Sequence, residues 1–449
     1  MNYIILGAGT VGLQIAEQLI SEDKDVVLIE KDPDRARNAD EHLDCQVINE
    51  IGNNVEALKE AGIENCAAFI SVTDSDEVNM ISCLLVASEF NVPMKIARVR
   101  NTDYSKSKLL HRPFIGIDNI VNPEIETARA IVNTVEQGAI SDVLLFEDSD
   151  IQARTVYIGE SSRLAGHSLE VIRRLFPQEF LVVGILRQDQ VIIPHGQTVI
   201  RKHDHVDLIA TRRNMEKIFA GAENEKKSLQ KIVLVGGGKI GSYVAELLTR
   251  KGKTLKIIEQ DYELAKKLSA RFPQAMVIKS DISNEDIFHE ENLGSCDLII
   301  TTTNNQELNI LAALYGKSTG IPRAIALVTK KNYLNIASSV GINSTVNPKI
   351  CTVDAILKYI RRGNIKTIHT IFDGKAEILQ FQVDQDHPFV GRALKDLDLP
   401  VNTLVASVQR GKQTFIPGGE FVVRSEDLMI VFADNSTIPR LEELLAGRQ

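Results

Sequence analysis

A short apolar run that ends in a glycine-rich loop occurs twice in this chain, as IILGAGTVG at residues 4–12 and as VLVGGGKIG at residues 233–241. Three further pairs of similar segments follow in the same order: SVTDSDEVN with TTTNNQELN, VNPEIETARAI with VNPKICTVDAI, and GILRQDQVIIPHGQTVI with SVQRGKQTFIPGGEFVV. Because the repeat is about half a chain long, it indicates a tandem duplication of a whole structural unit and not a solenoid. The chain must therefore build one fold twice.

Each copy has two parts with different patterns. In the first part, Val- and Ile-rich runs such as NYIIL, DVVLI and AAFIS alternate with helical stretches, which predicts a doubly wound α/β domain with a parallel sheet. The second part has short β-runs, turn signals and little helix, which predicts a small β-rich α+β module. The predicted organisation is a Rossmann domain at 1–140, a β-rich module at 141–222, a linker at 223–230, a second Rossmann domain at 231–365 and a second module at 366–449.

Composition excludes several classes of protein. The net charge is −9 and no Lys- or Arg-rich run occurs, so nucleic acid is not expected as a partner. No apolar stretch approaches the roughly 20 residues of a membrane span, and the N-terminus has no signal-peptide pattern. The five cysteines form no CxxC pair and are expected to be buried thiols of a cytoplasmic protein.

The glycine-rich loops predict two nucleotide-binding sites. Each follows a strand and opens a helix, the context in which the first glycine allows a tight turn, the second admits pyrophosphate and the third permits helix packing. The helix N-terminus offers N–H groups and a positive dipole to phosphate, and an acidic residue at the end of the next strand can bind ribose hydroxyls. The candidate residues are Gly7, Ala8, Gly9, Thr10, Val11, Gly12 and Glu30 in the first copy, and Gly236, Gly238, Lys239, Ile240, Gly241 and Glu259 in the second.

The two predicted clefts differ at two positions. Arg98 ends the strand KIAR and could grip a phosphate, or could pair with a nearby aspartate at the surface; Leu327 stands at its counterpart. Asp281 could reach an adenine or ribose edge, or could only cap its loop, and Glu50-Ile51 replaces Ser280-Asp281 in the first copy. We therefore expect the first cleft to hold pyrophosphate more tightly, unless a lysine or arginine from elsewhere compensates in the second. A Leu327→Arg change should strengthen the second cleft if its geometry matches that of the first.

No catalytic or metal site is expected. His203-Asp204-His205 reads as a solvated turn because its counterpart Glu426-Asp427-Leu428 lacks the histidines, and no HExxH or triad spacing occurs. Gly138 and Gly363 are candidate hinges between Rossmann domain and β-module, or ordinary helix C-caps.

At this level of detail the chain resembles the TrkA family. The resemblance rests on the tandem GxGxxG loops, the TDSDEVN segment from Thr73 to Asn79, the ARVR run and the β-module with its RxxxxxxP spacing. It implies two RCK modules, each made of an RCK N-terminal (KTN) Rossmann domain and a TrkA C-terminal domain. It also implies NAD(H) as the main ligand, with ATP or ADP possible in the same clefts, bordered by Thr73, Asp74 and Thr303.

The same resemblance implies a cytoplasmic regulatory role. Such a protein would form a gating ring, as a homodimer or homotetramer, on the inner face of the membrane beneath a Trk potassium transporter subunit of the TrkH or TrkG kind. It would not be an enzyme. The alternatives are an NAD-dependent oxidoreductase, for which the β-modules offer no repeated proton donor, and a nucleotide-sensing DNA-binding repressor, which the acidic charge disfavours.

Overall fold

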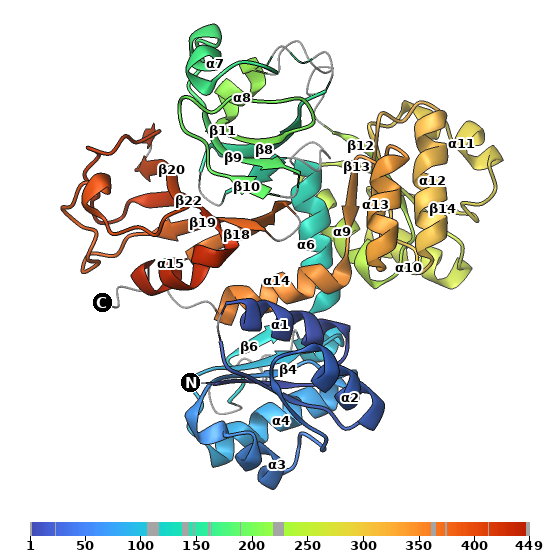
Figure 1. Ribbon diagram of the computed structural model, residues 1–449. Coiled ribbons are helices and arrows are strands. Elements are labelled where there is room, and N and C mark those ends of the chain that lie inside the picture. Colours follow the sequence, from blue (N-terminus) through green and yellow to red (C-terminus); the bar gives the residue numbers. More distant parts are fainter. Residues whose placement is uncertain are drawn as a thin grey trace. The chain divides into compact units, whose positions relative to one another are not determined.

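The computed structural model groups the chain into two compact units, which are described separately. One unit holds Met1–Ser141 and Lys226–Ile360, and the other holds Asp142–Glu225 and Arg361–Gln449 (Figure 1). The structure describes residues 2–22, 24–105, 116–136, 143–146, 149–159, 162, 164–188, 190–218, 229–360, 365–372, 375–411 and 413–445.

The first unit contains two parallel six-stranded sheets of identical topology, which confirms the predicted doubly wound class. Their orders are β3-β2-β1-β4-β5-β6 and β14-β13-β12-β15-β16-β17. The first sheet consists of β1 (Asn2–Leu6), β2 (Val26–Ile29), β3 (Gln46–Ile48), β4 (Cys66–Ser71), β5 (Lys95–Arg98) and β6 (Asn119–Val121). The second consists of β12 (Lys231–Val235), β13 (Thr254–Glu259), β14 (Met276–Lys279), β15 (Leu298–Thr301), β16 (Arg323–Leu327) and β17 (Ser344–Val346).

Helices connect the strands of both sheets. Those of the first half are α1 (Thr10–Ser21), α2 (Pro33–His42), α3 (Val55–Glu60), α4 (Asp76–Glu89) and α5 (Thr102–Ser105). Those of the second are α9 (Lys239–Arg250), α10 (Tyr262–Arg271), α11 (Asp286–Glu290), α12 (Gln306–Ser318) and α13 (Lys331–Ser339). Side-chain N-caps begin several of them: Asp32 accepts hydrogen bonds from the backbone of Asp34 and Arg35, and Asp261 from that of Leu264.

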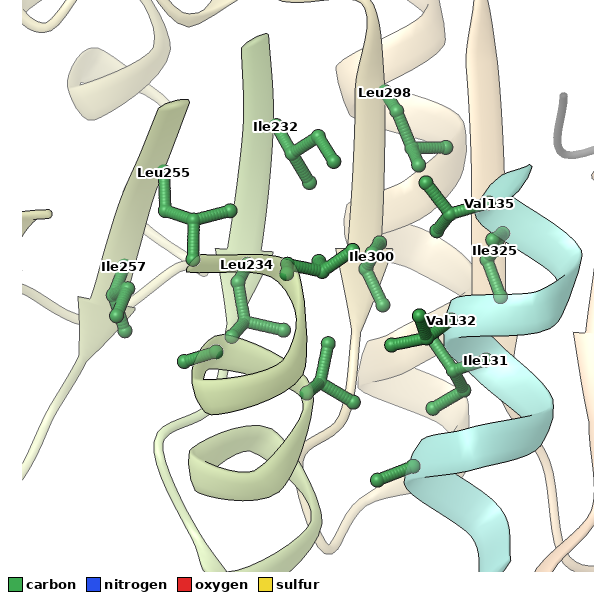
Figure 2. Close-up of a cluster of buried hydrophobic side chains, with 14 of the residues drawn as sticks. Ile131, Val132, Val135, Ile232, Leu234, Leu255, Ile257, Leu298, Ile300 and Ile325 are labelled. Atoms are coloured by element: carbon green, nitrogen blue, oxygen red, sulfur yellow. The ribbon is translucent and has the colours of Figure 1, made fainter. Parts of the chain in front are cut away.

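The two segments of this unit, Met1–Ser141 and Lys226–Ile360, are called its first and second half. The last helix of each half packs on the opposite half, so the two halves exchange helices. On α6 (Pro123–Glu136), Ala128, Ile131, Val132 and Val135 recur at helical spacing and join the core of the second half. Figure 2 shows Ile131, Val132 and Val135 of α6 facing Leu298, Ile300 and Ile325 of the second half.

The reciprocal helix is α14 (Pro348–Ile360). It buries Val353, Ile356, Leu357 and Ile360 in the core of the first half. In Figure 1, α6 lies beside α9 and α14 beside α1. Each half therefore completes its hydrophobic core only with a helix of the other, a relation that the sequence pattern does not reveal.

The second unit contains two five-stranded antiparallel sheets, as predicted for the β-rich modules. Their orders are β10-β9-β11-β8-β7 and β18-β19-β22-β20-β21. The strands are β7 (Val143–Leu145), β8 (Ile151–Tyr157), β9 (Leu181–Arg187), β10 (Gln190–Ile192), β11 (His205–Thr211), β18 (Ile365–Ile371), β19 (Ala376–Gln382), β20 (Thr403–Arg410), β21 (Gln413–Phe415) and β22 (Leu428–Asp434), with helices α7 (Leu169–Leu175), α8 (Arg212–Ile218) and α15 (Ile438–Leu445). One core joins both sheets, with Ile151, Val183 and Ile209 packed among Ile378, Ile430 and Phe432.

The structure corrects the expected role of His203-Asp204-His205. The segment does turn, with His203 at φ 67°, but Asp204 is buried and not solvated. Its carboxylate accepts two hydrogen bonds from Arg187, from Nε at 2.9 Å and from Nη2 at 2.7 Å. Arg410 and Asp427 repeat this bidentate pair in the second module.

Candidate functional site

The first and third glycines of each loop are required by the fold itself. Gly7 and Gly236 adopt φ values of 106° and 91°, which only glycine tolerates readily. A Cβ atom on Gly12 would lie 1.9 Å from the Gly7 carbonyl oxygen, and one on Gly241 would lie 1.9 Å from that of Gly236. These four glycines thus let the helix start directly against its strand.

The middle glycines, Gly9 and Gly238, have no such structural reason. Their φ values are −73° and −57°, and a Cβ atom on either would meet nothing within 4 Å. Both are N-caps without a side chain, so no side-chain capping bond satisfies the first N–H groups of α1 and α9. Glycine at this position is what a phosphate group that approaches the backbone requires.

The remaining loop residues divide between core and cleft. Thr10 and Lys239 are exposed at the starts of α1 and α9. Val11 is buried in the core of the first half, and Ile240 packs against the core of the second. These two predicted site residues therefore hold the helix in place with their side chains, and only their backbone can face a ligand.

Glu30 and Glu259 hold the glycine-rich loops. The Glu30 carboxylate accepts hydrogen bonds from the backbone N–H of Ala8 at 2.7 Å and of Asp32 at 3.0 Å. Glu259 does the same with Gly237 at 2.7 Å and Asp261 at 2.9 Å. Both are buried, yet an ionised carboxylate has about four acceptor positions, so ribose hydroxyls can still bind there.

A buried asparagine that the sequence reasoning did not single out organises each cleft. The Asn79 side-chain oxygen accepts two hydrogen bonds from Thr73, one from the Thr73 backbone N–H at 2.9 Å and one from the Thr73 hydroxyl at 2.7 Å. The Asn79 side-chain nitrogen donates hydrogen bonds to the carbonyl oxygens of Thr73 and Arg98. Asn309 makes the same four bonds with Thr303 and Leu327. Each asparagine ties the loop after the fourth strand to the end of the fifth. The signal was available, since asparagine recurs at this place in SVTDSDEVN and TTTNNQELN.

Arg98 is a sparsely partnered cation at the edge of the first cleft. Its Nη1 atom lies 3.5 Å from the Thr73 carbonyl oxygen and 4.0 Å from the Asp74 carboxylate, and its Nε atom has no hydrogen-bond partner. Burial, aided by the neighbouring Arg100, lowers the pKa of Arg98. Asp74 is well exposed, and its carboxylate also lies 3.7 Å from Nη1 of Arg35. An anion would therefore find the Arg98 guanidinium still short of acceptors.

Leu327 stands at the equivalent place but belongs to the core. In the pairing register, Arg98 faces Val121 and Leu327 faces Val346. The Leu327 residue is 6% exposed and packs in the cluster that contains α6. The condition for a stronger second cleft, that its geometry match the first, is therefore not met at this position, because the guanidinium of an arginine at 327 would enter an apolar core.

The second cleft is an open pocket of about 240 Å³. Among its lining residues are the predicted Gly236, Gly238, Glu259, Asp281 and Thr303. Asp281 also caps its loop, because Oδ1 accepts from the Ser283 N–H at 2.9 Å and hydroxyl at 2.8 Å. The backbone hydrogen bond from Ser283, followed by that from its side chain, lowers the pKa of Asp281. Both roles considered for Asp281 are thus compatible with its position.

Other predicted features lie outside these clefts. Gly138 and Gly363 fall outside the described residues. Within the described part of the chain, no cluster of three or more His, Cys, Asp or Glu side chains could hold a metal ion. In that same part, no helix combines the length and apolar character needed to cross a membrane.

Comparison with known protein families gives matches in both halves. The model of the TrkA-N domain matches residues 3–123 and 232–348, which hold the two Rossmann sheets. The model of the TrkA-C domain matches residues 154–220 and 378–446, which hold most of the two antiparallel sheets. The order of the four matches is that of the internal repeat.

Full-length relatives and solved structures agree with this organisation. The Trk system potassium uptake protein TrkA of Halomonas elongata is 33% identical over 450 residues, covering 99% of this chain and 98% of that protein. A TrkA homolog of Methanosarcina mazei is 31% identical, with coverage of 99% on both sides. Among solved structures, the GsuK channel bound to NAD has a TM-score of 0.55 at 15% identity, covering 100% of this chain and 79% of that one, which shows a shared fold.

Proposed function

This chain belongs to the TrkA family, and on that premise we propose that it is a nucleotide-binding regulatory subunit of a Trk-type potassium-uptake system. NAD(H) is the proposed main ligand, with ATP or ADP as alternatives in the same two clefts. The protein acts as a sensor and not as an enzyme. It docks peripherally on the cytoplasmic side of a membrane-embedded Trk transporter subunit, whose gate the bound nucleotide biases.

The observation that carries nucleotide binding is the pair of middle glycines. Gly9 and Gly238 have ordinary φ values and open space around them, so the folded protein alone does not need glycine there. Both halves nevertheless keep it, in front of an uncapped helix N-terminus. A diphosphate that contacts the backbone N–H groups accounts for the glycine, the missing cap and the open cleft together.

The same glycines give a direct test. Gly9→Val and Gly238→Val each put a branched side chain into the space for phosphate, and the added Cβ atom meets nothing within 4 Å in the protein. Calorimetric titration with NADH and ADP should show two sites in the wild type, one in each single variant and none in the double variant. Thermal unfolding of the same samples serves as the folding control. Unchanged binding in the double variant would refute nucleotide binding in these clefts.

Regulation requires that the ligand bind two conformations of an assembly unequally, because equal binding shifts no equilibrium. A chain with two fused copies of a Rossmann domain and its β-rich module can supply a symmetric ring, most simply as a homodimer with four Rossmann domains or as a homotetramer. Light scattering across micromolar concentrations should therefore show an assembly larger than the 49.7 kDa chain. A monomer throughout would count against the ring, and failure to co-purify with a membrane potassium transporter from its own cell would count against the docking.

A further inference from the structure

The exchange of helices brings charged side chains from one half toward the glycine-rich loop of the other. Lys349 lies on α14 one turn before Val353, and residues four apart share a helix face. Val353 packs in the core of the first half, so Lys349 faces that half as well. Its Nζ atom lies 3.4 Å from the hydroxyl oxygen of Thr10, the first residue of α1.

Lys349 is partly buried at this position, and no carboxylate of the described residues pairs with its ammonium group. Within the described part of the chain, its ammonium group forms no ion pair and contacts the Thr10 hydroxyl. Thr10 follows Gly9, the residue whose open surroundings mark the phosphate position. An ammonium beside that hydroxyl therefore stands at the edge of the space that a pyrophosphate would fill.

The second cleft has the opposite arrangement. Its helix α9 begins with Lys239 where α1 begins with Thr10, so a cation is supplied by its own half. The residue of α6 that matches Lys349 is Glu124, in the matched segments VNPEI and VNPKI. Glu124 lies one turn before Ala128 on the face that packs on the second half. Burial raises the pKa of Tyr243 on α9, and the charge of Glu124 is a smaller contribution in the same direction. The same charge also acts on Arg98 of the first half.

We propose that Lys349, from the exchanged helix of the second half, is a phosphate-binding residue of the nucleotide cleft in the first half. This inference rests on the proposed function, since it assigns one more contact to the same site. The first cleft then receives Arg98 from its own half and Lys349 from the other. The second has Lys239 from its own half, and Glu124 stands at the sequence position that matches Lys349. Nucleotide bound in the first cleft thereby contacts both halves of the chain.

The test uses the full chain with the second cleft closed by Gly238→Val, so that titration reports the first cleft alone. Three variants are made in this background: Lys349→Gln, Lys349→Arg and Lys358→Gln. The last is a matched control at the far end of the same helix. The probes are NAD⁺, ADP and adenosine, which lacks phosphate. Lys349→Gln should raise the Kd for NAD⁺ and ADP by about three- to tenfold, as expected for one partly exposed charged contact. It should leave the Kd for adenosine unchanged.

The conservative change Lys349→Arg should retain tight binding of NAD⁺ and ADP, and Lys358→Gln should match the background. A Lys349→Gln variant that binds ADP as tightly as the background would overturn the inference. Equal losses for ADP and adenosine would also overturn it, because they would indicate a general distortion of the cleft. If the wild type binds at one site and the Gly238→Val background does not bind at all, the inference fails while nucleotide binding in the second cleft stands. If the wild type binds no nucleotide, both proposals fail.

Discussion

Arg98 and Leu327 stand at the same place in the two halves, at the ends of β5 and β16, with the same asparagine-mediated bond to their carbonyl oxygens. One side chain is a cation whose Nε atom has no partner, and the other is part of the hydrophobic core. The backbone and its hydrogen bonds were thus kept through the duplication, while the charges around the clefts changed. The fold and the charge around the clefts are therefore separable in this protein.

The groups that make the same contacts in both halves are not the groups that differ between the halves. Backbone N–H groups, Glu30 with Glu259, and Asn79 with Asn309 form the same contacts in both halves. The differences lie in side chains: Arg98 against Leu327 at a strand end, Thr10 against Lys239 at a helix start, and Lys349 against Glu124 on the exchanged helices. Variants that change either the shared groups or the differing side chains can test whether the two halves differ only in charge.

The largest expected effect is a loss of stability when the arginine of the first half, at position 98, is placed at the equivalent position 327 of the second half. Leu327→Arg buries an unpaired guanidinium in the core and should lower the free energy of unfolding by about 3 kcal/mol or more. The reciprocal Arg98→Leu should change stability little. Chemical denaturation followed by circular dichroism measures both. A Leu327→Arg protein as stable as the wild type would show that the two positions are equivalent after all.

A second large effect concerns the exchanged helices. Ile131→Ala and Ile356→Ala remove matched, fully buried side chains from α6 and α14, and each should cost about 2–5 kcal/mol. Because each helix packs on the opposite half, Ile131→Ala should loosen the second Rossmann sheet and Ile356→Ala the first. Hydrogen exchange resolved by peptide reports which sheet loses protection. Loss of protection confined to the half that carries the mutation would contradict the exchange.

A smaller effect is expected in the first cleft alone. Arg98→Ala should weaken NAD⁺ binding there about ten- to a hundredfold, because a charge-assisted bond to phosphate contributes on the order of 1.5–3 kcal/mol. The fold should persist, since Arg98 lies at a strand end. Titration in the Gly238→Val and Gly9→Val backgrounds separates the clefts, and only the first should respond. Unchanged affinity would make Arg98 a surface charge without a role in binding.

The smallest effect should be the same in both clefts. Glu30 and Glu259 place a carboxylate where the 2′-phosphate of NADPH would lie, so repulsion should disfavour NADPH relative to NADH by about tenfold. Titration of each single-cleft background with both dinucleotides tests this. Tighter binding of NADPH in either cleft would show that its glutamate serves only to hold the glycine-rich loop.

The sequence predicted the features that depend on local pattern. Alternating apolar runs and helices, and glycines at fixed spacing, identified both sheets and both loops because these depend on neighbours in the chain. It did not predict that α6 and α14 change places, because the apolar face of a helix does not specify which sheet it covers. Asn79 was also missed: its recurrence as Asn309 marked the position, but its hydrogen bonds to a loop and a strand end appear only in the folded chain. Asp204 was misjudged for the same reason, because Arg187 lies far from it in sequence.

The exchange of α6 and α14 also bears on how the chain holds together. Two separate copies of a half-chain with this topology would have to meet in solution before either could complete its core, so their stability would depend on concentration. Joining the halves in one polypeptide makes that encounter intramolecular, and the effective concentration of the partner is then set by chain connectivity. The paired cores of the two halves are therefore complete as soon as one chain has folded, however dilute the protein is.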